Sequence, residues 1–188
     1  MAKRITALFL FSFYIFSTGV LVAQETQEKI QWLTWEEAME KSKIEPRKII
    51  MEVYTEWCVW CKRMDEKTFK NESIIKYMNE NYYAVKFDAE HKEEVEFNGE
   101  VYKFVKSGRN GYHELAAELL KGRLTFPTLV FMEEDAEVIQ SLAGFKSPMQ
   151  FMQMITYFGE NRHRNTPWST YKKSFAPPRQ MLIKNEDH

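Results

Sequence analysis

The chain has 188 residues, of which 44% are hydrophobic and 15% aromatic, and its net charge is −1. This length and apolar content are enough for one domain with a real core and some extension at its ends. The balanced charge provides no overall field for nucleic acid or an acidic membrane, and we find no glycine-rich phosphate loop, paired-histidine metal motif or internal repeat.

The first 23 residues have the pattern of a secretory signal peptide. Residues 1–4 include two basic side chains, and residues 5–23 are apolar with a few small polar interruptions. We expect cleavage between Ala23 and Gln24, which gives a periplasmic or otherwise extracytoplasmic protein. The alternative is an uncleaved N-terminal membrane anchor, because the apolar stretch approaches the length that spans a bilayer.

The region that follows alternates helical and strand patterns. A Thr34–Glu37 capping box predicts one helix start, and Asn71 predicts another. Apolar runs rich in strand formers predict buried strands. In chain order we expect a helix over 35–42, a strand over 48–54, a helical stretch over 62–69, a helix over 72–81 and a strand over 82–87 that ends at Asp88.

A long excursion over about 89–122 comes next. Alternation around Asn98-Gly99 predicts a β-hairpin over 95–102, residues 107–111 predict a flexible loop, and the leucines after residue 114 predict a helix. The last elements are a proline-led strand over 126–132, a strand over 138–142 and a helix capped by Ser147.

These elements predict an α/β sandwich, in which chemistry lies at the carboxyl ends of the parallel strands. We divide the chain into a signal peptide over 1–23, a domain over 24–160 with its insert at about 89–122, and a C-terminal tail over 161–188. The prolines and basic residues of the tail predict a segment that wraps the surface or is mobile.

The only two cysteines, Cys58 and Cys61, lie between a predicted strand and a predicted helix. The first turn of a helix favours an anion, and so favours the thiolate form of Cys58. A bridge that closes so short a loop would stabilise the fold weakly, so we favour a redox pair over a structural staple.

This region resembles the active site of the thioredoxin superfamily, most nearly the C-terminal thioredoxin domain of the bacterial membrane thiol:disulfide interchange proteins. The resemblance covers about residues 31–158. It is carried by the run 52–62 with Lys67-Thr68-Phe69 after it, by Phe126-Pro127-Thr128, and by Gly144. It implies a three-layer α/β/α sandwich with a central mixed sheet of four to five strands and an insert before the cis-proline strand.

The resemblance also implies roles for individual residues. Cys58 would be the exposed attacking thiol and Cys61 the buried resolving thiol. Pro127 would face the disulfide in a cis peptide, with Phe126 and Thr128 receiving a substrate chain; without the cysteines, Pro127 would be an ordinary strand-opening proline. No cofactor is implied, because the electrons reside on the two sulfurs.

Glu52 is the acid in an otherwise apolar strand. We expect it to point inward beneath the cysteines, where burial raises the pKa of its carboxyl group and allows proton exchange with Cys61. The alternative is an outward-facing residue on an alternating strand.

Several neighbouring residues are candidates for substrate contact. Trp57 would shape the substrate rim or pack in the core, and Trp60 would alter access to Cys58. The insert would form a wall or lid beside the thiols, or would be a surface decoration. A zinc site built from both cysteines with His91 and His113 is possible by ligand type alone.

We therefore expect an exported thiol-disulfide oxidoreductase that reduces disulfide-containing exported proteins and is reset by a membrane thiol donor. An oxidase or isomerase would use the same atoms, and a non-catalytic binding module would use Trp60, the insert and the tail. The sequence leaves the direction of electron flow and the oligomeric state open.

Overall fold

The computed structural model describes residues 28–108, 110–179 and 181. The predicted signal peptide over 1–23 lies outside these residues. No helix within the described ranges combines the length and apolar character needed to cross a membrane.

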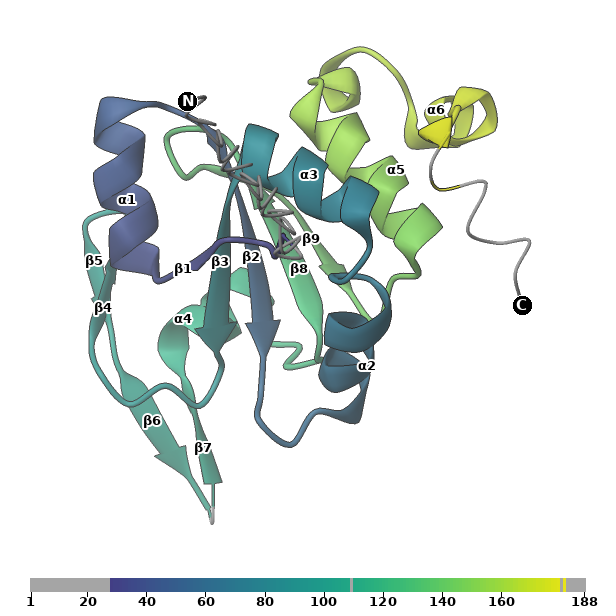
Figure 1. Cartoon of the computed structure of the whole chain (residues 1–188). Coiled ribbons are helices and arrows are strands. Elements are labelled where there is room, and N and C mark those ends of the chain that lie inside the picture. Colours follow the sequence, from purple (N-terminus) through teal and green to yellow (C-terminus); the bar gives the residue numbers. More distant parts are fainter. Residues whose placement is uncertain (1–27, 109, 180, 182–188) are drawn as a thin grey trace, which may run out of the picture.

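A five-stranded mixed sheet forms the centre of the molecule (Figure 1). The first three strands in spatial order run parallel, and the last two follow in antiparallel pairing. This confirms the predicted mixed sheet. In spatial order the strands are β1 (Trp32–Leu33), β3 (Tyr82–Asp88), β2 (Lys48–Tyr54), β8 (Thr128–Met132) and β9 (Val138–Ala143).

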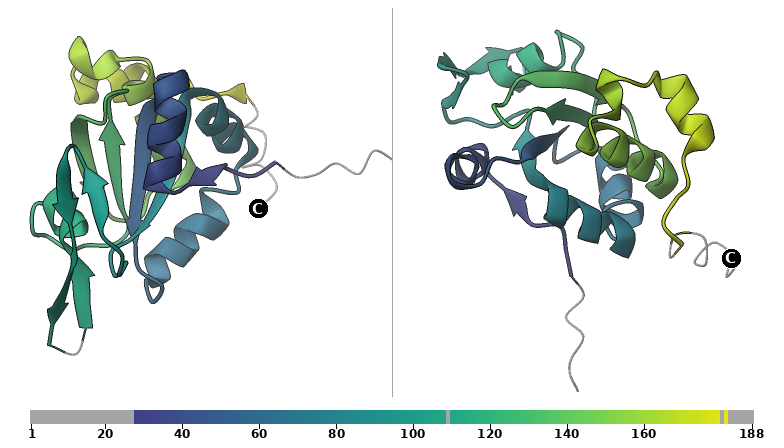
Figure 2. Two further views of the ribbon diagram at one scale, coloured as in Figure 1. Left: turned by 90° about the vertical axis from the view of Figure 1, so that its left-hand side faces the viewer. Right: turned by 90° about the horizontal axis from the view of Figure 1, so that it is seen from above.

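Helices cover both faces of this sheet (Figure 2). Helices α1 (Trp35–Ile44) and α4 (Glu114–Leu119) pack on one face, and α2 (Val59–Lys67), α3 (Glu72–Asn81) and α5 (Pro148–Gly159) pack on the other. Alternation along β2 supplies both cores, because Ile49 and Met51 face α1 and α4 whereas Ile50 faces α3 and α5. The predicted α/β/α sandwich is therefore confirmed.

The helix starts follow from the predicted caps. Thr34 and Glu37 form a capping box at α1, and the side chain of Asn71 accepts a hydrogen bond from the backbone N–H of Ile74 at the start of α3. Ser147 forms a further capping box at α5. Strand β1 was not predicted, because two residues are too few for a periodic pattern.

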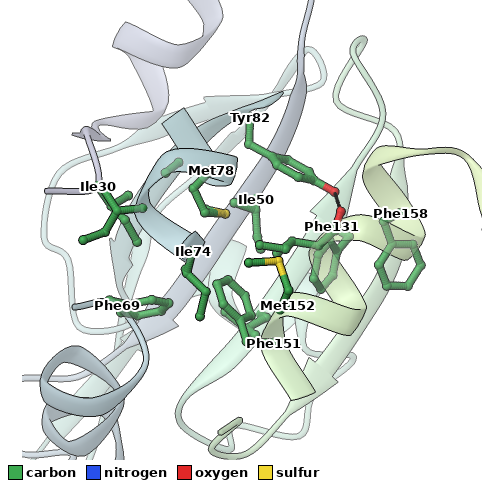
Figure 3. Packing of buried hydrophobic residues seen from close by; sticks show 14 of the residues in the cluster. Ile30, Ile50, Phe69, Ile74, Met78, Tyr82, Phe131, Phe151, Met152 and Phe158 are labelled. Atoms are coloured by element: carbon green, nitrogen blue, oxygen red, sulfur yellow. Dashed lines mark hydrogen bonds between the residues drawn. The ribbon is translucent and has the colours of Figure 1, made fainter. Parts of the chain in front are cut away.

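The larger core lies between the sheet and helices α3 and α5 (Figure 3). Ile74 from α3 and Phe151 from α5 meet over Ile50 and Phe131 of the sheet, and all four are buried. The hydroxyl group of Tyr82 donates a 2.7 Å hydrogen bond to the carbonyl of Ile155, which satisfies the one polar atom of that ring.

The insert contains two hairpins. The predicted one is confirmed as β4 (Val95–Phe97) and β5 (Glu100–Tyr102), joined at Asn98 and Gly99 with φ of 51° and 82°.

The prediction of a flexible loop over 107–111 is wrong for residues 107, 110 and 111, which lie in strands. Strands β6 (Phe104–Ser107) and β7 (Asn110–His113) form a second hairpin instead. A Cβ atom at Gly111 would lie 2.2 Å from Cζ of Phe104, so this glycine provides room for a ring rather than flexibility.

The described part of the tail packs on the body of the protein. It contains a 3₁₀ turn, η1 (Arg162–Arg164), and helix α6 (Trp168–Ser174). The hydroxyl oxygen of Tyr171 lies 2.6 Å from Oγ1 of Thr156 on α5, and Arg164 forms a 2.9 Å ion pair with Glu133 just after β8. This part of the tail therefore wraps the surface.

Candidate active site

The two cysteines lie where β2 passes into α2, at the carboxyl end of a strand that runs parallel to β3. Cys58 is the N-cap residue of α2. Its N–H donates to the carbonyl of Thr55 at 3.1 Å, and its Sγ accepts a 3.0 Å hydrogen bond from the N–H of Cys61. One unpaired amide of the helix start is thus directed at the sulfur of Cys58.

Cys58 and Cys61 are joined in a disulfide with a Cα–Cα distance of 5.3 Å. Cys58 is 5% exposed and Cys61 is 2% exposed. The expectation of an exposed attacking thiol is therefore wrong for this oxidised form, because the sulfur of Cys58 lies against the first turn of α2. Cys58 is still the more accessible of the two.

Large apolar side chains are exposed beside this covered disulfide. Trp57, Val59 and Trp60 are 61%, 74% and 54% exposed. The core alternative for Trp57 is excluded, since its ring stands at the surface, 6.0 Å from the ring of Phe126 and edge-on to it. A partner that approaches the disulfide would meet these side chains before it meets sulfur.

Glu52 is fully buried and points to the face of the sheet that α2 covers, as Ile50 does two residues earlier. Burial raises the pKa of Glu52 to about 7, and Lys86 partly opposes that shift. Nζ of Lys86 lies 3.3 Å from Oε2 of Glu52, within ion-pair distance, but the carboxylate accepts no well-aligned hydrogen bond from the described residues. The outward alternative is excluded, whereas the catalytic role of Glu52 stays a prediction.

Lys86 is a residue that the sequence analysis missed. It pairs with Glu52 in the register of β2 and β3, and its Nζ also lies 2.5 Å from Oδ1 of Asp65 on α2. Its ammonium group stands 5.2 Å from the ring centroids of both Trp32 and Tyr54. The available signal was a lysine in an apolar strand, four residues after Tyr82 and on the same face.

The proline segment lies at the start of β8. The Phe126–Pro127 peptide is cis. Thr128 is buried and its hydroxyl donates a 2.6 Å hydrogen bond to the carbonyl of Thr125. The hydroxyl of Thr128 thus bonds within the fold and the backbone of this residue lies between β2 and β9, so its contact with a substrate stays a prediction.

The histidines of the insert lie next to each other, with ring centroids 5.8 Å apart. His113 is buried; its Nδ1 accepts from the N–H of Leu115, its Nε2 lies 3.0 Å from the carbonyl of Glu93, and burial lowers its pKa. Within the described ranges no set of three or more His, Cys, Asp or Glu side chains is arranged to hold a metal ion. The zinc alternative gains no support from this geometry.

Solved structures share this fold. A thioredoxin-fold protein from Helicobacter pylori has a TM-score of 0.52 and 18% identity, covering 68% of this chain and 79% of that one. A thioredoxin from Thermus thermophilus has a TM-score of 0.51 and 16% identity, covering 73% and 98%.

Curated relatives match over shorter segments. Mouse spermatogenesis-associated protein 20 is 35% identical over 74 residues, which are 39% of this chain and 9% of the relative. An uncharacterized protein of Caenorhabditis elegans is 31% identical over 90 residues, which are 47% of this chain and 12% of the relative. The matched segment thus spans about a tenth of the length of these relatives.

A family model matches most of the chain, over residues 15–173. The family is Thioredox_DsbH, described as a protein of unknown function, DUF255. Together with the fold and the Cys58–Cys61 pair, this match supports a thiol-disulfide oxidoreductase in general terms. The chain belongs to the Thioredox_DsbH family, within the thioredoxin superfamily.

Proposed function

We propose that this protein is an exported reductase of protein disulfides that works through Cys58 and Cys61. One observation carries the proposal: a disulfide capped at the start of α2, with the buried, titratable Glu52 on the sheet face that α2 covers. A structural staple would not require a buried carboxyl group that changes charge near neutral pH.

The reaction begins with the reduced form. The Cys58 thiolate attacks one sulfur of a partner disulfide, so that a Cys58–partner S–S bond forms, the partner's own bond breaks and its other sulfur leaves as a thiolate that takes up a proton. Cys61 loses its proton and attacks Cys58. This step forms the Cys58–Cys61 bond, releases the second partner thiolate and completes the transfer of two electrons to the partner.

Glu52 would act in the second step. Cys61 must give up a proton before it attacks, and a carboxylate with a pKa of about 7 is ionised often enough to receive that proton and hold it. Lys86, 3.3 Å away, would favour the ionised form between turnovers. No bound cofactor enters this scheme.

A membrane thiol donor would return two electrons and two protons to the oxidised pair. The basic and apolar pattern of residues 1–23 supports export, and the exposed Trp57 and Trp60 support docking of a protein partner. An oxidase or isomerase would use the same atoms, and a binding module would use the same surface without chemistry.

Reduction assays separate these functions. The reduced protein should cleave insulin disulfides, and Cys58→Ser should abolish turnover, whereas a binding module would show no turnover in either form. The reduction potential gives the direction: we expect a value nearer to the roughly −270 mV of thioredoxin than to the roughly −120 mV of a strong oxidase. A value near the latter would overturn the reductase assignment.

Fractionation of cells that express the full chain tests export. Recovery of the protein outside the cytoplasm, shorter by the signal peptide, is the expected result. Retention in the cytoplasm at full length would contradict the proposal.

A further inference from the structure

A groove of about 280 Å³ lies directly beside the disulfide loop. One wall consists of Trp57, which precedes Cys58 in the chain, together with Leu124 and Phe126. Strand β7 of the insert also lines the groove, with Gly111 and Tyr112. Figure 1 shows hairpin β6–β7 reaching the same end of the molecule as the loop between β2 and α2. The insert therefore contributes half of a groove that opens next to the reactive sulfurs.

Within the described ranges, the edge of β7 that faces away from β6 has unpaired main-chain groups at Gly111. The N–H of Glu114 donates to Lys103 across the hairpin, whereas the N–H of His113 donates away from it, to Ala89. Hydrogen-bonding direction alternates along an antiparallel strand, so Gly111, two residues before His113, also directs its N–H and C=O away from β6. These groups are a template for one more extended chain.

A second polar feature of the groove is Thr55. It is 2% exposed, it lines the groove, and its hydroxyl oxygen has no hydrogen-bond partner among the described residues. An unpartnered buried hydroxyl is costly unless a ligand or water satisfies it. The groove thus combines apolar side chains with unpaired main-chain groups of Gly111, and the Thr55 hydroxyl is buried in its lining.

The charge of the groove favours one kind of occupant. Among the described residues that line it, Glu90 is the one with a carboxylate or a basic group, and its carboxylate accepts a 3.2 Å hydrogen bond from Nε1 of Trp57. An acidic side chain entering the groove would be repelled by this carboxylate, and a basic one would be attracted.

We propose that this groove binds an extended segment of the protein substrate, next to the cysteine that Cys58 attacks. The segment pairs its main chain with Gly111 on the edge of β7, and it inserts an apolar side chain between Leu124 and Phe126. A neighbouring basic residue is preferred over an acidic one because of Glu90. This inference rests on the proposed function and adds a role for the insert, whose strand β7 pairs with the main chain of the substrate.

Binding can be measured without redox chemistry. A peptide with Lys and Leu beside a serine, which replaces the cysteine, should bind the oxidised protein, and Leu124→Asp should weaken that binding about tenfold. Val101→Asp is the matched control, because Val101 is an exposed apolar residue, as Leu124 is, and does not line this groove. Equal affinities for wild type and Leu124→Asp would contradict binding of the peptide in this groove.

Reduction rates then connect the groove to the chemistry. For a peptide disulfide of the same sequence, Leu124→Asp should reduce the rate about tenfold, while the rate for a small aromatic disulfide stays unchanged. A peptide with the amide nitrogens beside the cysteine methylated should react about fivefold more slowly with wild type, because it cannot donate to the β7 edge. Equal rates for methylated and unmethylated peptides would contradict main-chain pairing.

The charge preference has its own control. Wild type should reduce the Lys peptide about threefold faster than a Glu peptide, and Glu90→Gln should remove that difference while keeping an acceptor for Trp57. An unchanged preference in Glu90→Gln would contradict the assigned role of Glu90. If peptides bind as expected but no disulfide is reduced, the proposed function is wrong and the peptide-binding groove is supported. If reduction is normal but Leu124→Asp changes nothing, the peptide-binding groove is wrong and the proposed function is supported.

Discussion

Two carboxyl groups near opposite ends of the central strands, the fully buried Glu52 and the partly buried Glu133, each face a lysine, yet their pKa values move in opposite directions. Burial raises the pKa of Glu52 to about 7, with Lys86 at 3.3 Å. Burial would also raise the pKa of Glu133, but hydrogen bonds from Lys48 and Arg164 outweigh it and lower that pKa to about 2.

The difference lies in burial and hydrogen bonding rather than in the presence of a cation, because the side chain of Glu52 is fully buried whereas that of Glu133 is 16% exposed. Glu133 accepts aligned bonds from two cations and fixes the tail to the end of β8, whereas both oxygens of Glu52 lack an aligned partner among the described residues. A well-bonded carboxylate stabilises the fold as a permanent charge, and a poorly bonded one exchanges protons near neutral pH. We therefore expect Glu133 to stabilise the fold, and this contrast is consistent with the proton-exchange role proposed for Glu52.

The largest expected effect is on catalysis. Glu52→Gln should slow release of the partner from the mixed disulfide by about 100-fold at pH 7, because Cys61 loses its proton acceptor. Rapid-mixing measurement of the resolving step checks this result. Glu66→Gln, an exposed change on the same α2 helix, should leave the rate unchanged, and an unaffected rate in Glu52→Gln would remove the catalytic role of Glu52.

The next largest expected effect is on the stability of the fold, through the carboxylate of Glu133. Glu133→Gln should lower the free energy of unfolding by about 3 kcal/mol, because Lys48 is left buried without its main partner. Urea unfolding measures it, with Glu134→Gln as the control: Glu134 is more exposed and lies 3.4 Å from Lys48. Reduction of small disulfides should be unchanged in both variants. A loss of turnover in Glu133→Gln would contradict a purely structural role for Glu133.

The pH dependence of unfolding should separate the two groups further. From about pH 4.5 to 7 the folded state holds a proton on Glu52 that the unfolded state releases, so the free energy of unfolding falls as pH rises, by at most roughly 3 kcal/mol. From about pH 4.5 down to 2 the unfolded state binds a proton at Glu133 that the folded state does not bind. The free energy of unfolding therefore falls as pH falls.

Urea titrations of the oxidised protein across this range test both slopes. Glu52→Gln should flatten the upper slope alone and be more stable than wild type at pH 8, and Glu133→Gln should flatten the lower slope alone. A single variant that flattened both slopes would show that the two carboxyl groups are coupled.

The smallest expected effect concerns Asp65, which competes with Glu52 for Lys86. The charge of Asp65 helps to raise the pKa of Glu52, so Asp65→Asn should lower it. The pH midpoint of the resolving step should then move to lower pH by less than about one unit. A move to higher pH would contradict this arrangement of charges.

Much of the fold was predictable because its signals are local. The Thr34–Glu37 box, the Asn71 cap and the apolar run over 48–54 each determine an element from neighbouring residues alone, and all three are confirmed. The inward direction of Glu52 also followed from local sequence, because the run in which it lies is otherwise apolar.

The features that were missed depend on contacts between distant segments. Gly111 resembled a loop residue. Glycine is needed there because the ring of Phe104 occupies the space of a Cβ atom, and this contact crosses a hairpin that no short sequence pattern reveals. Lys86 meets Glu52 only through the parallel register of β2 and β3. The burial of Cys58 likewise follows from how the oxidised pair lies against α2.

The most direct test of the account is to capture the mixed disulfide. Cys61→Ser and Cys58→Ser proteins, each reduced and then mixed with a peptide disulfide, are analysed by intact mass. We predict one stable peptide adduct on Cys58 of the Cys61→Ser protein and little or none on the Cys58→Ser protein. No adduct on Cys61→Ser, or equal adducts on both variants, would contradict the assignment of Cys58 as the sulfur that attacks.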